Sequence, residues 1–293
     1  MCQTAELKPT IRGCLRAIDD EYRNLECAGH TSTIADRSTD FATTADKRLT
    51  DTIREYFSSQ PARYRVLSEE SSAESNAEDR VVIADEIDGT ANMLNGGDAP
   101  FGPVLAVAAT EDPRFEDVIA AGFLSLQSGD LYEAYRGEGA FHTEGWVERE
   151  EDIEAASLST SGRTAVSGAD HPQILVDQYM LSGVPEVAER CWSVGYPGDF
   201  RSWMYHMGLV ARGSYDLAVT GDYCALHENK RATAEELAGG YLLVSEAGGT
   251  ITTWDGTDIG PERIGLAEGR TFDTVVGATE QLAREFARRL PDA

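Results

Sequence analysis

The first half of the chain alternates between two apolar periods, and each period predicts a different kind of element. Near the N-terminus, apolar side chains recur every three or four residues, which predicts an amphipathic helix. The apolar face of this helix carries Leu7, Ile11, Cys14, Ile18 and Tyr22. After a polar loop at residues 27–39, the spacing of Leu49, Ile53 and Phe57 predicts a second helix. Short apolar runs predict strands at residues 64–67, 81–84, 104–109, 118–125 and 131–135, the last three antiparallel.

The second half of the chain predicts a mixed series of elements. An acidic stretch at residues 148–154 is the expected boundary between an N-terminal lobe, residues 1–150, and a C-terminal lobe, residues 151–293. The predicted order beyond it is strand 158–160, helix 172–180, strand 192–194, helix 200–211, strand 215–219, a helix carrying Leu237, Tyr241 and Val244, strand 275–276 and helix 280–290. Helices mixed with antiparallel strands are typical of an α+β fold.

The most informative segment is the run from Val81 to Met93. Four apolar residues predict a buried strand, and Asp85 and Asp88 follow it on either side of Ile87. Gly89 comes next, and Thr90 is expected to be the N-cap of a helix that begins at Ala91. Carboxylates crowded at such a point repel each other unless a cation lies between them. Because free helix amides also attract anions, the segment indicates metal-assisted phosphate chemistry.

Acidic residues upstream strengthen this interpretation. The predicted strand at residues 64–67 ends in Ser68, Glu69 and Glu70, so two neighbouring strands would deliver carboxylates to one edge. Asp46 is expected in the first turn of the second helix. Taken alone, Asp46 would be interpreted as an ordinary acid at the start of a helix. An isolated pair of aspartates such as Asp85 and Asp88 would be interpreted as solvated side chains in a turn. Glu70 is expected to be a solvated acid that plays no direct part in the site.

Charge restricts the partners of the protein. The chain has 51 acidic and 25 basic residues, a formal net charge of -26, and lysine only at Lys8, Lys47 and Lys230. Such a surface would repel nucleic acid and anionic membranes, so neither is an expected partner. The scarcity of lysine, together with the charge, indicates a halophilic protein adapted to high salt, where screening weakens self-repulsion.

Cysteine usage and hydropathy point to a protein of the cytoplasm. The five cysteines show no CxxC spacing, which argues for reduced thiols and against a zinc site or a disulfide framework. No run is long and apolar enough to span a membrane, and the N-terminus lacks the pattern of a signal peptide. A dinucleotide-binding fold is disfavoured because no GxGxxG follows a predicted strand.

Four motifs in order resemble those of the inositol monophosphatase family of magnesium-dependent, lithium-sensitive phosphatases. They are DFATTAD at residues 40–46, SEES at 68–71, DEIDGTANM at 85–93 and LAGGYLLVSEAGGTI at 237–251. The resemblance covers nearly the whole chain. It implies a layered α/β/α/β/α sandwich of the sugar-phosphatase type, a homodimer, and two or three Mg²⁺ ions, with Mn²⁺ as a substitute and Li⁺ as an inhibitor.

The resemblance also implies roles for individual residues. Glu69, Asp85 and the carbonyl of Ile87 would hold the first magnesium ion, and Asp88 would bridge to a second. Asp46 and Thr90, with Glu69, would orient and activate the attacking water. The amides of Gly89, Thr90 and Ala91 would bind the phosphate, and Asp88 would lie beside the substrate.

The chain departs from the family pattern at the end of the site that receives the alcohol. The position of the metal-binding aspartate falls on Glu236, with Asp222 as an alternative ligand. The family segment G-S/T-A-A becomes Arg201-Ser202-Trp203-Met204, in which Ser202 and Trp203 are expected to contact substrate. Thr220 stands near the position of a substrate-binding acid, in a loop that also carries His227.

Two further positions are notable. Glu86 replaces the usual proline beside the first metal, and the sequence does not assign it a role. His206, in a predicted helix, is expected to be a packed side chain and not a base.

The function expected from the sequence is therefore Mg²⁺-dependent hydrolysis of small phosphate monoesters, such as inositol monophosphate or a fructose 1,6-bisphosphate-like substrate. One alternative is a phosphatase of the 3′-phosphoadenosine 5′-phosphate type. Another is a non-catalytic regulatory protein that binds metal or phosphate.

Overall fold

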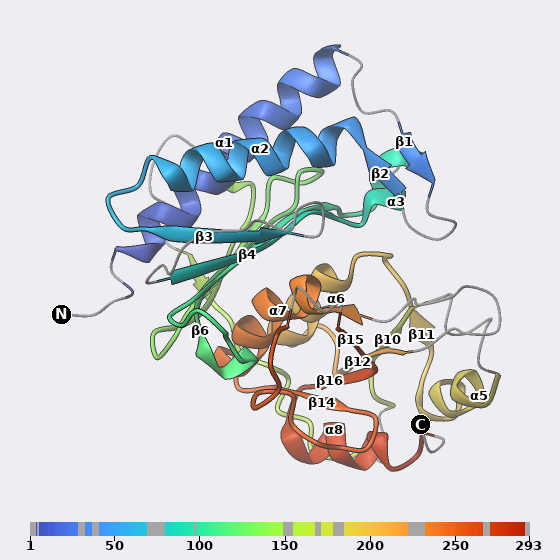
Figure 1. Cartoon of the computed structure of the whole chain (residues 1–293). Coiled ribbons are helices and arrows are strands. Elements are labelled where there is room, and N and C mark those ends of the chain that lie inside the picture. The colour runs from blue at the N-terminus through green and yellow to red at the C-terminus, as the bar shows by residue number, and fades with distance from the viewer. Residues whose placement is uncertain are drawn as a thin grey trace.

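The computed structural model describes residues 4, 6–28, 33–36, 41–68, 80–96, 98–148, 155–167, 171–177, 185–221, 232–265 and 270–290. Within these residues the chain forms two large sheets separated by helices (Figure 1). No helix of the described residues is long and apolar enough to cross a membrane.

The larger sheet has seven strands in sequential order. Its strands are β3 (Tyr64–Ser68), β4 (Arg80–Asp88), β5 (Gly102–Ala108), β6 (Val118–Leu124), β7 (Leu131–Tyr135), β8 (Gly139–Thr143) and β9 (Ala156–Ser157). Strands β3 and β4 are parallel, and every later neighbour pair is antiparallel. Because β3 and β4 run the same way, their C-terminal ends meet at one edge, as the sequence predicted.

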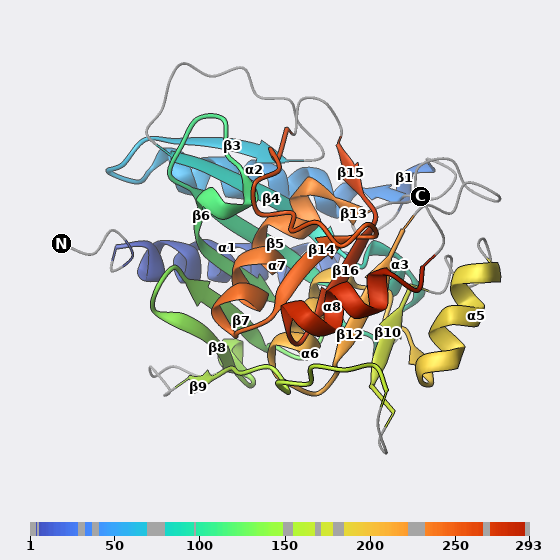
Figure 2. The same cartoon turned by 90° about the horizontal axis from the view of Figure 1, so that it is seen from below.

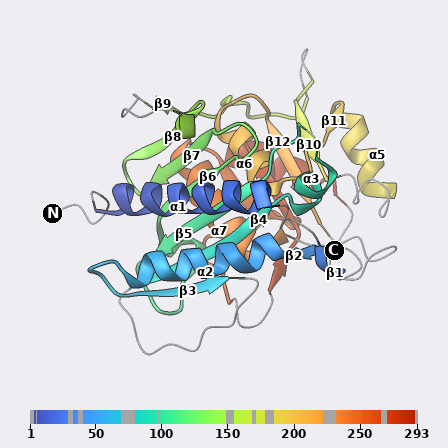
Figure 3. The same cartoon turned by 90° about the horizontal axis from the view of Figure 1, so that it is seen from above.

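Two long helices cover one face of this sheet. They are α1 (Leu7–Ala28) and α2 (Thr44–Ser58), which lie side by side across the strands (Figure 3). The predicted apolar face of α1 is fully or largely buried, which confirms the amphipathic pattern. Short elements complete this lobe: β1 (Thr33–Asp36), β2 (Phe41–Thr43), α3 (Thr90–Asn95), and the 3₁₀ turns η1 (Phe115–Asp117) and η2 (Trp146–Glu148).

The smaller sheet has five strands in the order β11-β10-β12-β16-β14. Its strands are β10 (Ile174–Val176), β11 (Pro197–Gly198), β12 (Leu217–Thr220), β14 (Thr250–Thr253) and β16 (Thr274–Gly277). Helix α8 (Glu280–Ala287) packs on the outer face of this sheet, and α5 (Pro185–Val194) lies at its edge (Figure 2). The two-stranded pair β13 (Ala232–Thr233) and β15 (Thr271–Phe272) stands apart.

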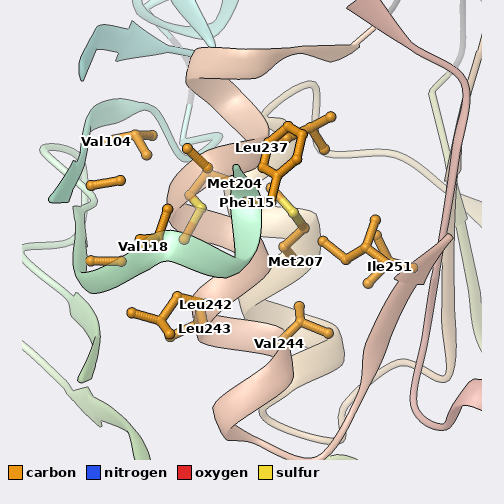
Figure 4. Close-up of a cluster of buried hydrophobic side chains, with 14 of the residues drawn as sticks. Val104, Phe115, Val118, Met204, Met207, Leu237, Leu242, Leu243, Val244 and Ile251 are labelled. Atoms are coloured by element: carbon orange, nitrogen blue, oxygen red, sulfur yellow. The ribbon is translucent and has the colours of Figure 1, made fainter. Parts of the chain in front are cut away.

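Helices α6 (Trp203–Ala211) and α7 (Ala234–Glu246) fill the layer between the two sheets. Their side chains form a continuous apolar core with Val104 and Phe115 on one side and Ile251 on the other (Figure 4). Gly240 of α7 permits close contact with α6, since a Cβ there would lie 2.1 Å from the Sδ atom of Met207. The order of layers is helix, sheet, helix, sheet, helix, which confirms the predicted α+β sandwich.

The glutamate of the EAGG motif has a structural role. Both carboxylate oxygens of Glu246 accept hydrogen bonds from the turn between β7 and β8, one from the amide of Gly137 at 2.8 Å and one from the amide of Gly139 at 3.0 Å. The motif therefore joins the end of α7 to the larger sheet.

Most predicted elements are confirmed, and three are wrong. Residues 172–180 were expected to be helical, but Ile174–Val176 form strand β10. Residues 192–194 were expected to be a strand, but they end helix α5. The strand expected at residues 158–160 instead lies at Ala156–Ser157. The polar loop predicted at residues 27–39 also contains strand β1. The division into lobes at residue 150 stays a prediction.

A buried ion pair ties α1 to the larger sheet. The Arg12 guanidinium donates to both carboxylate oxygens of Glu133 on β7, at 2.6 and 3.0 Å, and the Glu133 side chain is fully buried. Lys8 lies 3.8 Å from the same carboxylate, and the Tyr135 hydroxyl donates to it at 2.8 Å. The charge of Glu133 is therefore compensated almost entirely by α1.

We expect Arg12→Met to lower the free energy of unfolding by about 3 kcal/mol, because it leaves a buried carboxylate without its main partner. The double variant Arg12→Met/Glu133→Gln should recover more than half of that loss, since it removes the charge as well. Arg48→Met is the control, because Arg48 pairs with Glu21 at the surface and should cost less than about 1 kcal/mol. Urea unfolding measures all three, and equal losses for Arg12→Met and Arg48→Met would contradict the prediction.

Candidate active site at the end of strand β4

The end of β4 brings three acidic side chains into the protein interior. Asp85, Glu86 and Asp88 are 8%, 2% and 3% exposed. The pairing of β4 with β5 becomes irregular between Asp85 and Asp88, so the regular alternation of side chains is interrupted there. This irregularity lets acids that are close in sequence gather at the sheet edge.

Asp85 and Asp88 meet Glu236 from helix α7. Each of the three residues offers one carboxylate oxygen, and these oxygens lie within 4.8 Å of one another. Three carboxylates at such distances and in such burial repel one another strongly unless a cation is bound. Hard oxygen ligands of this kind suit a magnesium ion. The structure thus brings together three of the residues that the sequence proposed as metal ligands, although Asp88 and Glu236 are 148 positions apart in the sequence.

The N-terminus of helix α6 fixes the carboxylate of Asp88. The Ser202 hydroxyl donates to Oδ2 at 2.6 Å and the Met204 amide donates to the same oxygen at 2.9 Å. The Trp203 amide donates to Oδ1 at 3.0 Å. A carboxylate accepts about four hydrogen bonds or metal contacts. Since three are occupied, the orientation of Asp88 is set by α6 and about one position remains open to a metal ion.

Two opposing effects act on the pKa of Asp88. Burial raises the pKa above its ordinary value, while the three donors from α6 and the nearby His206 oppose that rise. The net direction is upward, so the ionised form of Asp88 is destabilised in the absence of a cation. A bound metal ion would supply the missing stabilisation.

Glu236 serves α7 and the acidic cluster together. It is the third residue of α7, and its Oε2 accepts a hydrogen bond from the Thr233 amide at 2.7 Å. The Thr233 hydroxyl in turn accepts from the Glu236 amide, which completes a capping box. Glu236 is therefore a first-turn acid of α7 and also a member of the acidic cluster, while its role as a metal ligand stays a prediction.

The turn after Asp88 has a glycine in the left-handed region. Gly89 has φ 83° and is the N-cap of the short helix α3. Thr90 is the first residue of α3, and its hydroxyl donates to the Ile87 carbonyl at 2.9 Å. The expectation that Thr90 is the N-cap is wrong, because the positive φ at Gly89 starts the helix one residue earlier.

Asn92 fixes this turn against the second half of the chain. Its Nδ2 donates to the carbonyls of Pro100 and Phe200, both at 2.7 Å. Among the described residues, no acceptor is bound to the amides of Thr90 and Ala91, so both remain available to an anion. Phe200 is part of the segment that leads into α6, and Asn92 therefore holds that segment beside the turn.

A second buried group of polar side chains joins helix α2 to β4. Asp46, in the first turn of α2, is 6% exposed. The Thr50 hydroxyl lies 2.9 Å from the Asp46 carbonyl and 2.8 Å from Oε1 of Glu86. Sequence reasoning missed Thr50, although its position one helical turn after Asp46 places both on one face.

Burial, with a smaller contribution from the charge of Asp46, raises the pKa of Glu86 from its ordinary value of 4.5 to about 7, although hydrogen bonds from Thr50 and Ser68 lower it. The folded protein without metal therefore binds a proton at Glu86 between about pH 4.5 and pH 7 that the unfolded chain has released. The stability contributed by that proton is present at low pH and is lost as the pH rises through this window.

We expect Glu86→Gln to remove this pH dependence, since glutamine keeps a polar contact with Thr50 and cannot ionise. In the presence of a chelator, the free energy of unfolding of the unaltered protein should fall, relative to Glu86→Gln, by at most about 3 kcal/mol between pH 4.5 and pH 7. Denaturant unfolding at a series of pH values measures this difference. Glu55→Gln, on the exposed face of α2, should parallel the unaltered protein. Parallel curves for Glu86→Gln would contradict the prediction.

The remaining predicted residues are placed as follows. Thr220 is buried at the end of β12, where its carbonyl accepts a hydrogen bond from the Trp254 indole at 2.9 Å. His206 is 1% exposed in α6, and its Nε2 accepts from the Phe200 amide at 2.9 Å, which confirms a packed side chain. Glu69, Glu70, Asp222 and His227 lie outside the described residues.

The sequence model of the inositol monophosphatase family matches residues 4–290. The chain belongs to this family. Among curated relatives, it is 28% identical over 244 residues to the histidinol-phosphatase of Streptomyces coelicolor, a match that covers 81% of this chain and 83% of the relative. It is also 28% identical over 184 residues to the fructose-1,6-bisphosphatase/inositol-1-monophosphatase of Methanothermobacter thermautotrophicus. That second match covers 61% of this chain and 57% of the relative.

Solved structures of the family share the fold. An IMPase/NADP phosphatase complexed with Mg²⁺ and phosphate superimposes with a TM-score of 0.71 at 18% identity, covering 99% of this chain and 96% of the other. The extragenic suppressor protein SuhB from Bartonella henselae gives a TM-score of 0.72 at 17% identity, covering 97% and 98% of the two chains. The family and its curated relatives are phosphatases, which confirms the expectation of an enzyme that hydrolyses phosphate monoesters.

Proposed function

We propose that the protein catalyses Mg²⁺-dependent hydrolysis of small phosphate monoesters, with inositol monophosphate or a fructose 1,6-bisphosphate-like sugar phosphate as substrate. The observation that carries this proposal is the cluster of Asp85, Asp88 and Glu236, whose oxygens lie within 4.8 Å of one another. The cluster stands beside a turn whose Thr90 and Ala91 amides are available to an anion. A site that attracts cations and phosphate together suits metal-assisted phosphoryl transfer to water.

The donor set fits magnesium. Asp85, Asp88, Glu236 and the carbonyl of Ile87 would hold the metal ions, with Glu69 as the further ligand that family resemblance implies. When bound, Mg²⁺ would neutralise charge on the phosphoryl group and lower the pKa of a water molecule at the site. The bridging role of Asp88 stays a prediction, and its three hydrogen bonds from α6 favour a single metal contact.

The protein's own groups would position water and phosphate. The Thr90 hydroxyl gives its single proton to the Ile87 carbonyl, so it can only accept a hydrogen bond from water. This restricts the water to an orientation in which one of its lone pairs can face the phosphorus atom. Asp46 would take part in activating the same water. Gly89, Thr90 and Ala91 would bind phosphate oxygens through their amides.

The choice among substrates depends on the segment at residues 201–204 and on Thr220, which we propose to contact the alcohol end. A panel of inositol 1-phosphate, fructose 1,6-bisphosphate, 3′-phosphoadenosine 5′-phosphate and histidinol phosphate, assayed with and without Mg²⁺ at low and high KCl, tests the proposal. Release of phosphate from none of them under any condition would overturn it. The homodimer, the adaptation to salt, the cytoplasmic location and the effects of Mn²⁺ and Li⁺ stay predictions.

We expect Asp88→Asn to lower kcat by at least about 100-fold, which corresponds to about 3 kcal/mol of transition-state stabilisation. The variant removes a charge that the cation needs, while asparagine still accepts a hydrogen bond from α6. Steady-state phosphate release measures kcat, and a thermal melt checks that the variant is folded. Asp98→Asn, an exposed residue beyond α3, should behave like the unaltered protein. A folded Asp88→Asn with near-normal kcat would contradict the assignment.

We expect Glu236→Gln to raise the Mg²⁺ concentration for half-maximal activity by at least about tenfold, with little change in melting temperature, since glutamine can complete the capping box. Glu236→Ala should raise the Mg²⁺ requirement and also cost about 1 kcal/mol of stability, because the hydrogen bond from the Thr233 amide to the Glu236 side chain is lost. Magnesium titrations of Glu235→Gln and Asp222→Ala provide the comparison. If Asp222→Ala raises the Mg²⁺ requirement and Glu236→Gln does not, the ligand is Asp222.

A further inference from the structure

Arg201 has an unusual backbone conformation beside the phosphate-binding turn. Its φ is 53°, and it is the only residue other than glycine with a positive φ in the described part of the chain. A non-glycine residue in this region costs about 1–3 kcal/mol of conformational strain. Glycine would occupy the position without strain, and glycine is the residue in the family segment G-S/T-A-A. The arginine therefore needs an explanation in terms of its side chain.

Neighbouring contacts hold Arg201 in this conformation. Its amide donates to Oδ1 of Asp199 at 2.8 Å. Asn92 contacts the carbonyl of Phe200 at 2.7 Å and that of Arg201 at 3.4 Å. On the other side, Ser202 is fixed by its hydrogen bond to Asp88. The conformation is thus determined by the same groups that build the site.

The backbone of Arg201 touches the first residue of the phosphate-binding turn. A Cβ atom added to Gly89 would lie 3.3 Å from the Arg201 carbonyl oxygen and 3.1 Å from that of Pro100. Gly89 is therefore enclosed by the two segments, and the backbone of Arg201 lies against the turn that is proposed to bind phosphate.

Within the described part of the chain, the guanidinium of Arg201 has no acidic partner. The residue is exposed, and no carboxylate of the described residues forms an ion pair with it, although acids outnumber bases about two to one in the chain. A guanidinium binds phosphate or carboxylate through two parallel hydrogen bonds, and its charge is retained at any working pH. A permanently charged side chain on a residue whose backbone touches the proposed phosphate-binding turn suits a second anionic group on the substrate.

We propose that Arg201 is a specificity-determining residue that binds a second phosphate group of the substrate, so that the enzyme favours bisphosphates over esters with a single phosphate. This inference rests on the proposed function, because it concerns the substrate of the same site. It assigns the strain at residue 201 to substrate selection, whereas the metal cluster and the amides of the turn bind the phosphate that is released.

The test compares fructose 1,6-bisphosphate with inositol 1-phosphate as substrates of the full-length protein with Mg²⁺. The variants are Arg201→Gln, Arg201→Lys and Arg201→Gly, and Arg288→Gln at the end of α8 is the control with the same change in charge. For Arg201→Gln, KM for the bisphosphate should rise about tenfold more than KM for the monophosphate. Arg201→Lys should lose part of this discrimination. Arg201→Gly should lose it fully while melting no lower than the unaltered protein.

Salt gives an independent readout. The Debye length falls from about 10 Å at 0.1 M to about 3 Å at 1 M. Preference for the bisphosphate should therefore weaken with KCl in the unaltered protein and vary little in Arg201→Gln. Equal changes in KM for the two esters in Arg201→Gln would overturn the inference and leave the proposed function standing. The same would follow if Arg288→Gln changed the two KM values as Arg201→Gln does. Failure of the unaltered protein to hydrolyse either ester would overturn the proposed function, and the inference with it.

Discussion

The repulsion among buried carboxylates at the end of β4 is the constraint on which the site depends. Asp85, Asp88 and Glu236 place three oxygens within 4.8 Å of one another, and another buried acid, Glu86, follows Asp85 on the same strand. In water such groups would separate, but here each is held in place by its surroundings: the irregular end of the inner strand β4, the N-terminus of α6, or the capping box of α7. The fold therefore supplies the rigidity, and a divalent cation would supply the opposite charge. This division explains why buried acids are found where an apolar core would be more stable.

The layered architecture makes that arrangement possible. The larger sheet delivers Asp85 and Asp88, while α6 and α7 lie between the sheets and direct their N-termini to the same edge. Helix N-termini carry unpaired amides and partial positive charge, so they favour the carboxylates that meet them. The Trp203 and Met204 amides bind Asp88 directly, and Glu236 caps its own helix. Residues far apart in sequence meet because the helices begin where the strand ends.

The sequence predicted the parts of the fold in which local pattern and tertiary environment agree. The run at Val81–Ala84 and the helical spacing of α1 were unambiguous, and the acids of the site could be located from the motif order.

The segment from β10 to α5 was not predictable in the same way. Ile174–Val176 is a fully buried parallel strand, and three apolar residues in a row have no period that separates a strand from a helix. In α5, Val187, Cys191 and Val194 do have helical spacing, but Trp192 and Val194 at its end favoured a strand locally. The N-cap at Gly89 was missed because threonine is the commoner cap, and only the backbone reveals a positive φ. The neighbours of Glu86 could not be inferred, because Thr50 comes from a helix 36 residues away and Ser68 from the neighbouring strand β3.

The substitution of glutamate at position 236 follows from the two functions that meet there. A capping box needs a side chain at the third helical position long enough to reach back to the amide of the cap residue, and glutamate or glutamine satisfies that requirement. One oxygen of Glu236 accepts from the Thr233 amide at 2.7 Å, and the carboxylate still reaches the cluster formed with Asp85 and Asp88. Aspartate is one methylene shorter, so at the same backbone position it could not extend as far toward both partners. The longer side chain therefore stabilises the start of α7 and also places a carboxylate oxygen beside those of Asp85 and Asp88.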